Sequence, residues 1–187
     1  AEFLGFSKRT DGRYTRSELM RCRAFIAFTH AEVEHYLELI ALKVLDRAEA
    51  KWDDRETVSK VVAGLLAFRQ PRDIDVPGNP MQQADNKKLP SLIKEAFARQ
   101  RSIVSANNGL KAKNLSELYI PLGIKPEDIE EALVIQLENF GSLRGGLVHN
   151  NAEVSLPRLR DPFDDEYRDV EYLIDELERF DQLAQRL

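Results

Sequence analysis

Residues 17–50 read SELMRCRAFIAFTHAEVEHYLELIALKVLDRAEA, and this stretch decides the fold. Its apolar and small side chains recur at intervals of three and four residues, which places them on one face of an α-helix. The stripe consists of Leu19, Cys22, Ile26, Thr29, Val33, Leu37, Ile40 and Val44, and it is widened by Phe25, Phe28, Tyr36 and Leu39. So long and wide a stripe predicts the central helix of the fold, from about Ser17 to Ala50.

Further helices are predicted after this stretch. A second helix is expected at about residues 54–68 with Asp54 as its N-cap, although the β-branched residues Val58, Val61 and Val62 leave a strand open as an alternative. The remaining helices are expected at about 90–106, 125–149 and 164–187, with a short helical turn at 115–122 and a proline-rich loop at 70–88.

This pattern predicts an all-α fold. The chain has no sustained alternation of apolar and polar residues and no internal repeat. We therefore expect a helical bundle of about five helices. Residues 1–14 are expected to be a loose lead-in, and residues 15–187 a single domain.

The composition is that of a globular protein of a reducing compartment. The 187 residues are 43% hydrophobic and 32% charged, and Cys22 is the single cysteine, so no internal disulfide is expected. No apolar run approaches the roughly 20 residues that span a bilayer, and no signal-peptide pattern is seen, so we expect a cytoplasmic protein with no membrane partner.

The net charge of −5 disfavours nonspecific binding of long nucleic acids but leaves open a locally basic cleft. Candidates for such a cleft are Lys87, Lys88, Lys111, Lys113, Arg158 and Arg160.

The stretch FGSLRGGLVHNN, residues 140–151, contains the strongest candidate chemistry. Arg144 can bind phosphate oxygens through its planar guanidinium, and His149 can exchange a proton near neutral pH, so the pair suits phosphodiester chemistry. Side chains five residues apart on an ideal helix differ by roughly 140° in azimuth. They converge if the helix loosens, for example by a π-turn, which Gly145 and Gly146 would permit. The alternative is that both cations offset the dipole at a helix C-terminus, and spacing alone does not decide between the two.

The segment HAEVEH, which begins at His30, does not match a metal-site pattern. It is neither H-E-x-x-H nor H-x-x-E-H, and Glu32 and His35 form one Glu-x-x-His pair where a di-metal bundle requires two. We therefore expect no metal, and the chain contains no cofactor fingerprint. His30 and Glu34 are interpreted either as part of a polar edge of the first helix or as groups that orient Arg144.

Three segments together carry a family resemblance. They are Ala31-x-x-Glu34-x-Tyr36-Leu37 on the first helix, then Leu118-Tyr-x-Pro-Leu-Gly-Ile124, then Leu143-Arg144-x4-His149-Asn150. In this order they resemble the HEPN superfamily, in particular the RiboL-PSP/MAE-type HEPN domains of bacterial defence and toxin systems. The resemblance covers about residues 15–187, and its specific part is the Arg-x4-His motif.

The resemblance implies an all-α domain that pairs with a second copy and brings two Arg-x4-His motifs into one cleft. It further implies a metal-independent endoribonuclease of a bacterial toxin or antiphage defence system. By this resemblance His149 serves the attack of the 2′-hydroxyl or protonates the leaving oxygen, while Arg144 holds the scissile phosphate. Glu34, His30 and Asn150 would support the pair. The expected partners are RNA, a second copy of the chain, and an antitoxin or other co-encoded protein.

One position departs from the family pattern. A polar residue, commonly Asn, often follows the Arg of the motif, whereas this chain has Gly145. Other members of the superfamily are catalytically silent and bind RNA or a partner protein. The alternative is therefore a non-catalytic helical module, for which we expect a wide exposed apolar surface and binding that depends on the first or last helix.

Overall fold

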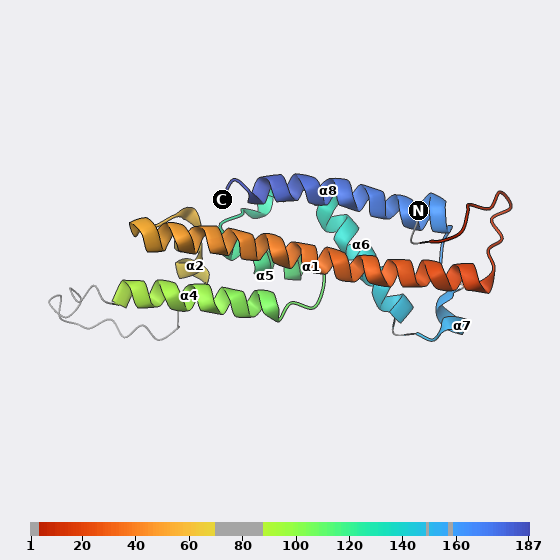
Figure 1. The fold of residues 1–187 in the computed structure, drawn as a ribbon, viewed down its shortest axis with the longest axis horizontal. Coiled ribbons are helices and arrows are strands. Elements are labelled where there is room, and N and C mark those ends of the chain that lie inside the picture. The colour runs from red at the N-terminus through yellow and green to blue at the C-terminus, as the bar shows by residue number, and fades with distance from the viewer. Residues whose placement is uncertain (1–3, 70–87, 149, 157–158) are drawn as a thin grey trace. The chain divides into compact units, whose positions relative to one another are not determined.

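The computed structural model describes residues 4–69, 88–148, 150–156 and 159–187, and the regular elements in these ranges are all helical (Figure 1). The predicted all-α class is therefore confirmed for the described part of the chain. The α-helices are α1 (Arg16–Arg55), α2 (Lys60–Arg69), α4 (Lys88–Ser105), α5 (Ala112–Tyr119), α6 (Glu131–Val148), α7 (Ala152–Ser155) and α8 (Arg168–Ala184). The shorter turns are the 3-10 turns η1 (Ile120–Leu122) and η2 (Pro126–Asp128) and the π-turn η4 (Pro162–Tyr167). Within these ranges, no helix combines the length and the apolar content that crossing a membrane requires.

The chain divides into two compact units. The first unit consists of residues 1–36, 109–112 and 129–181, and the second of residues 37–108, 113–128 and 182–187. α1 therefore contributes its first half to one unit and its second half to the other. The expectation that residues 15–187 form a single domain stays a prediction.

The apolar stripe of α1 is buried as predicted, but it is narrower than expected. Its buried members are Cys22, Ile26, Val33, Leu37, Ile40 and Val44. Of the residues predicted to widen it, Phe25 is buried, whereas Phe28 and Leu39 are exposed. Each of these two follows a buried residue by two positions, which turns its side chain roughly 200° around the helix. The stripe therefore does not extend to the face that bears Phe28 and Leu39.

The segment that follows α1 is a helix, so the strand alternative is excluded. α2 begins at Lys60, and the Ser59 hydroxyl oxygen accepts a hydrogen bond from the backbone N–H of Val62 at 3.2 Å. Ser59 is thus the N-cap of this helix. The prediction that Asp54 caps it is wrong, because α1 continues to Arg55 and includes Asp54.

One further helix starts later than predicted. α6 begins at Glu131 rather than near Lys125, because Pro126 opens the separate turn η2. In that turn the carbonyl oxygen of Lys125 accepts from a backbone N–H three residues later, at 3.0 Å, which is 3-10 rather than α-helical bonding. The loop predicted at 70–88 lies outside the described residues up to position 87, and α4 begins at Lys88.

Gln100 connects three helices of the second unit. Its side chain is fully buried, and its amide nitrogen donates to the backbone carbonyls of Glu117 and Leu118 at 3.0 Å each. Its amide oxygen accepts from Nε of Arg69 at 2.6 Å. One buried amide on α4 therefore satisfies groups of both α2 and α5, as buried polar atoms require.

Gly64→Ala should destabilise the second unit by about 2 kcal/mol. Gly64 lies in α2 against η1, and a Cβ at this position would lie 2.6 Å from the backbone carbonyl oxygen of Pro121. A backbone oxygen cannot rotate away, so the methyl group must push α2 and η1 apart. Thermal unfolding followed by circular dichroism should show a Tm lower by about 5 °C. Gly145→Ala is the control, because a Cβ there meets nothing within 4 Å; an equal loss in both variants would refute this explanation.

The described part of the lead-in is non-helical, but it is packed rather than loose. Leu4 is fully buried, and the ring of Phe6 contacts those of Tyr14 and Phe163 edge-on. The Tyr14 hydroxyl donates to a carboxylate oxygen of Asp161 at 3.0 Å. The lead-in is therefore anchored to the start of η4 by both apolar and polar contacts.

Candidate functional site

α6 remains a regular α-helix through its glycine pair. Gly145 and Gly146 both lie within α6, which ends at Val148. The π-type loosening considered for this stretch does not occur in the described part of α6. His149 lies outside the described residues, so its convergence with Arg144 stays a prediction.

Arg144 belongs to a cluster formed by α1 and α6 in the first unit. The ring of His30 stacks on that of Phe140, with the ring centroids 6.0 Å apart. Nδ1 of His30 lies 3.6 Å from Oε2 of Glu34, one turn further along α1. Arg144 follows Phe140 by one turn of α6, and its positive charge acts on His30. Of the two α1 residues that were interpreted as orienting Arg144, His30 is near enough to be affected by its charge, and Glu34 lies beside His30.

His30 is neutral in this cluster. The residue is 4% exposed, and burial, together with the nearby charge of Arg144, lowers its pKa from 6.5 to about 4. At neutral pH the imidazole therefore does not repel the guanidinium. The 3.6 Å separation from Glu34 is too long for a normal hydrogen bond. His30 thus provides a packed wall beside Arg144 rather than a second charge.

Arg23 holds the C-terminal end of α6, a role that sequence reasoning missed. Its Nε donates to the carbonyl oxygen of Leu147 at 3.0 Å, and its Nη2 donates to that of Asn150 at 2.9 Å. The side chain of Asn150, predicted to support catalysis, donates to the carbonyl oxygen of Gly146 at 2.6 Å. Both side chains therefore satisfy carbonyl groups at the end of the helix that carries Arg144. The one sequence feature that could have indicated this role is the position of Arg23, directly after Cys22, which belongs to the apolar stripe of α1.

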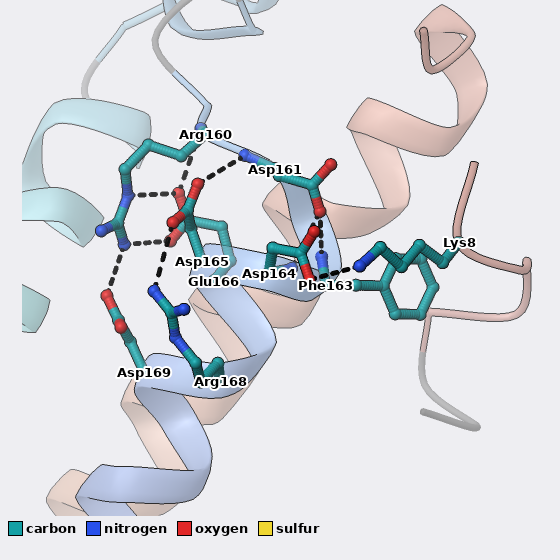
Figure 2. Close-up of polar contacts among 9 residues, drawn as sticks. All are labelled: Lys8, Arg160, Asp161, Phe163, Asp164, Asp165, Glu166, Arg168 and Asp169. Atoms are coloured by element: carbon teal, nitrogen blue, oxygen red, sulfur yellow. Dashed lines mark hydrogen bonds and ion pairs between the residues drawn. The ribbon is translucent and has the colours of Figure 1, made fainter. Parts of the chain in front are cut away.

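The last helix begins with a π-turn, two residues before the start predicted near Asp164. A carboxylate oxygen of Asp161 accepts from the backbone N–H groups of Phe163 and Asp164 at 2.9 Å each (Figure 2). The backbone N–H of Glu166 donates to the carbonyl oxygen of Asp161 at 3.1 Å, which is the five-residue spacing of a π-helix. This start of the helix contains Glu166, whose carboxylate binds Arg160.

Arg160, predicted to line a basic cleft, is neutralised by two acidic side chains. Figure 2 shows its guanidinium between Glu166 and Asp169, with Nη2 at 2.9 Å from Oε2 of Glu166 and 2.8 Å from Oδ2 of Asp169. The hydrogen bond that Arg160 donates to Glu166, followed by the one that it donates to Asp169, raises the pKa of Arg160 above its usual value. The prediction that Arg160 contributes to a basic cleft is therefore wrong.

A cavity of about 430 Å³ lies beside α6, but Arg144 does not line it. The lining residues are Gln136, Asn139, Phe140, Leu143, Arg160, Asp169 and Leu173. The guanidinium in this wall, that of Arg160, is already paired. The cavity therefore does not suit the binding of a phosphate group.

The other candidates for a basic cleft add no support for one. Lys113 lies 3.7 Å from a carboxylate oxygen of Glu117, one turn further along α5. Lys111 is exposed. Arg158 and the side chains of Lys87-Lys88 lie outside the described residues. A basic cleft is therefore not observed in the part of the chain that the structure describes.

Metal binding and thiol chemistry are two further possibilities for the described residues. Among the described residues, no group of three or more His, Cys, Asp or Glu side chains is arranged to hold a metal ion. Cys22 is buried, and burial raises the pKa of its thiol to about 12. Because the thiolate is the reactive form, Cys22 is a core residue, as predicted, and not a nucleophile.

In comparisons of this chain with protein-family models, with curated proteins and with solved structures, no match was found.

Proposed function

We propose that this chain is a metal-independent endoribonuclease of the HEPN type that acts in a bacterial toxin or antiphage defence system. Two copies of the chain would pair so that Arg144 and His149 of each meet in one cleft. The observation that supports this proposal best is the setting of Arg144, which is half-buried on α6 beside the buried, neutral His30 of α1. A guanidinium held against such a wall loses little freedom when it binds a phosphate group.

The proposed reaction is an internal transesterification of RNA. The 2′-oxygen forms a bond to the adjacent phosphorus and the bond from phosphorus to O5′ breaks, which leaves a 2′,3′-cyclic phosphate and a 5′-hydroxyl. His149 takes the proton of the 2′-hydroxyl or gives one to the departing 5′-oxygen, and water carries out the other of these two proton transfers. Arg144 donates hydrogen bonds to the non-bridging phosphate oxygens and stabilises the charge that develops on them. These steps use side chains and water alone, so cleavage should persist when a chelator is present.

A second candidate function is a non-catalytic helical module that binds a partner protein. Exposed apolar side chains on α1 and α8 favour it: Phe28 is 65% exposed, Tyr172 is 53% exposed and Ile174 is 46% exposed. Large apolar side chains gathered on one surface are typical of interaction sites. This candidate predicts that substitutions at these positions impair binding, whereas a substitution at His149 does not.

Expression of the wild type beside His149→Ala separates the two candidates. The wild type should arrest bacterial growth and degrade total RNA to fragments that end in a 2′,3′-cyclic phosphate, whereas His149→Ala should do neither. His35→Ala replaces an exposed histidine of α1 and is the matched control, which should be as toxic as the wild type. Normal growth and intact RNA with all three proteins, together with no cleavage by the purified chain, would rule out the ribonuclease.

A further inference from the structure

The packing of α8 along α1 leaves an apolar groove on the first unit. The two helices run in the same direction, since Phe25 stacks on Tyr167 before the start of α8 and the Tyr36 hydroxyl donates to Asp181 near its end (Figure 1). Between these contacts lies a groove of about 360 Å³. Its walls are Thr29, Glu32, Val33 and Tyr36 of α1 and Ile174, Leu177 and Glu178 of α8.

The groove belongs to a larger apolar surface. Val33 and Leu177 are buried at its base, whereas Ile174 is about half exposed. An adjoining hollow of about 500 Å³ shares Ile174 and adds Tyr172. On α1, Phe28 precedes Glu32 by one turn and so lies on the same face of the helix. Exposed apolar side chains therefore continue from the groove along both helices.

The rim of this surface is acidic. Its carboxylates are Glu32, Glu171, Asp175 and Glu178. Within the described ranges, no ion pair joins Glu32, Asp175 or Glu178 to a basic side chain. The guanidinium at the adjoining hollow, that of Arg168, points instead to Asp165, with a closest N–O distance of 3.4 Å. The surface thus presents an apolar floor between unneutralised negative charges.

We propose that this acidic-rimmed groove, between residues 28–36 of α1 and 171–178 of α8, binds a basic amphipathic helix of a partner protein. The nine residues of the α1 wall and the eight of the α8 wall extend roughly 10 to 12 Å along the helix axis. That length suits two to three turns of a bound helix whose apolar residues recur at i, i+3 or i+4, and i+7. Lysine or arginine side chains beside this apolar stripe would face the four carboxylates and favour association.

A second copy of the chain is a poorer occupant than a basic helix. In a symmetric pair the same surface meets itself, so each acidic rim would face an identical one. Like charges brought together in this way disfavour association. The groove is therefore distinct from the homodimer contact of the proposed ribonuclease, and this inference does not depend on that activity.

A designed helical peptide with leucines on one face and lysines on the other tests this inference. Fluorescence anisotropy of the labelled peptide should show that the full chain binds it at least about tenfold more tightly than the same peptide with glutamates in place of lysines. Ile174→Ser should weaken binding of the lysine peptide about tenfold, because it removes an apolar contact without disturbing the core. The double variant Glu32→Gln and Glu178→Gln should weaken binding and reduce its dependence on salt.

Two variants outside the groove are the matched controls. Ile135→Ser replaces an isoleucine of α6 that is 51% exposed, and Glu131→Gln replaces an exposed carboxylate at the start of that helix. Both should bind the lysine peptide as the wild type does. Equal binding of the two peptides, or of the wild type and Ile174→Ser, would overturn the proposal. A change from dimer to monomer in Ile174→Ser, measured by sedimentation, would also overturn it, because the groove would then hold a second copy.

Discussion

Arg144→Ala should lower the rate of RNA cleavage by about 100-fold or more and abolish growth arrest. In the proposed reaction the guanidinium stabilises charge that develops on the phosphate oxygens, and an alanine leaves that charge without a donor. Arg144 is half-buried, and its neighbour His30 is neutral, so the fold should tolerate the loss of the cation. Initial rates on purified RNA, resolved by gel electrophoresis, measure the effect, and circular dichroism verifies that the variant is folded.

Two further arginine variants distinguish a catalytic role from a general loss of charge. Arg144→Lys keeps the positive charge but loses the planar fork that binds two oxygens at once, so an intermediate rate is expected. Arg99→Ala removes an exposed arginine of α4 that pairs with Glu95 one turn earlier, and cleavage should be unchanged. If Arg144→Ala cleaves RNA at the rate of the wild type, the proposed site is wrong.

The free energy of unfolding should fall as the pH is lowered from about 6.5 to about 4, and His30 should account for part of this fall. The pKa of His30 is lowered from 6.5 to about 4 in the folded chain, chiefly by burial and further by Arg144. Between these values the unfolded chain binds a proton at this residue and the folded chain does not, so acid favours unfolding. From about pH 6.5 to about pH 4, protonation of His30 in the unfolded chain lowers the free energy of unfolding by an amount on the order of 3 kcal/mol. Above about pH 6.5 this loss of stability disappears.

Urea unfolding at a series of pH values measures this contribution as the difference between the wild type and His30→Gln. The variant has no imidazole to protonate, so its stability should fall less steeply over the same window. His35→Gln replaces an exposed histidine of the same helix and should keep the steep dependence of the wild type. Parallel curves for the wild type and His30→Gln would show that His30 is not buried in a neutral form.

Much of the helical layout could be predicted from local sequence. The stripe from Cys22 to Val44 specifies a helix and the face that it buries, because a period of 3.6 residues is a property of neighbouring positions. The same kind of pattern predicted the approximate positions of α4 and α8, and it predicted that the fold is all-α. His30 and Glu34 lie one turn apart on α1, and Phe140 and Arg144 one turn apart on α6, because such spacing is a local property. The meeting of Arg144 with His149 stays a prediction.

The tertiary structure decided which surfaces are covered and which charges are paired. Sequence periodicity did not show that Phe28 is exposed to solvent, or that Ile174 borders an open groove. Nor did it show that the guanidinium of Arg160 is already bound by Asp169, or that Arg23 donates to a carbonyl group 127 residues away. Burial, pairing and pKa depend on groups that are distant in sequence and come together in the folded chain. The sequence alone therefore determined most of the helices and identified Arg144 as a candidate catalytic residue, whereas packing in the folded chain set the environment of each side chain.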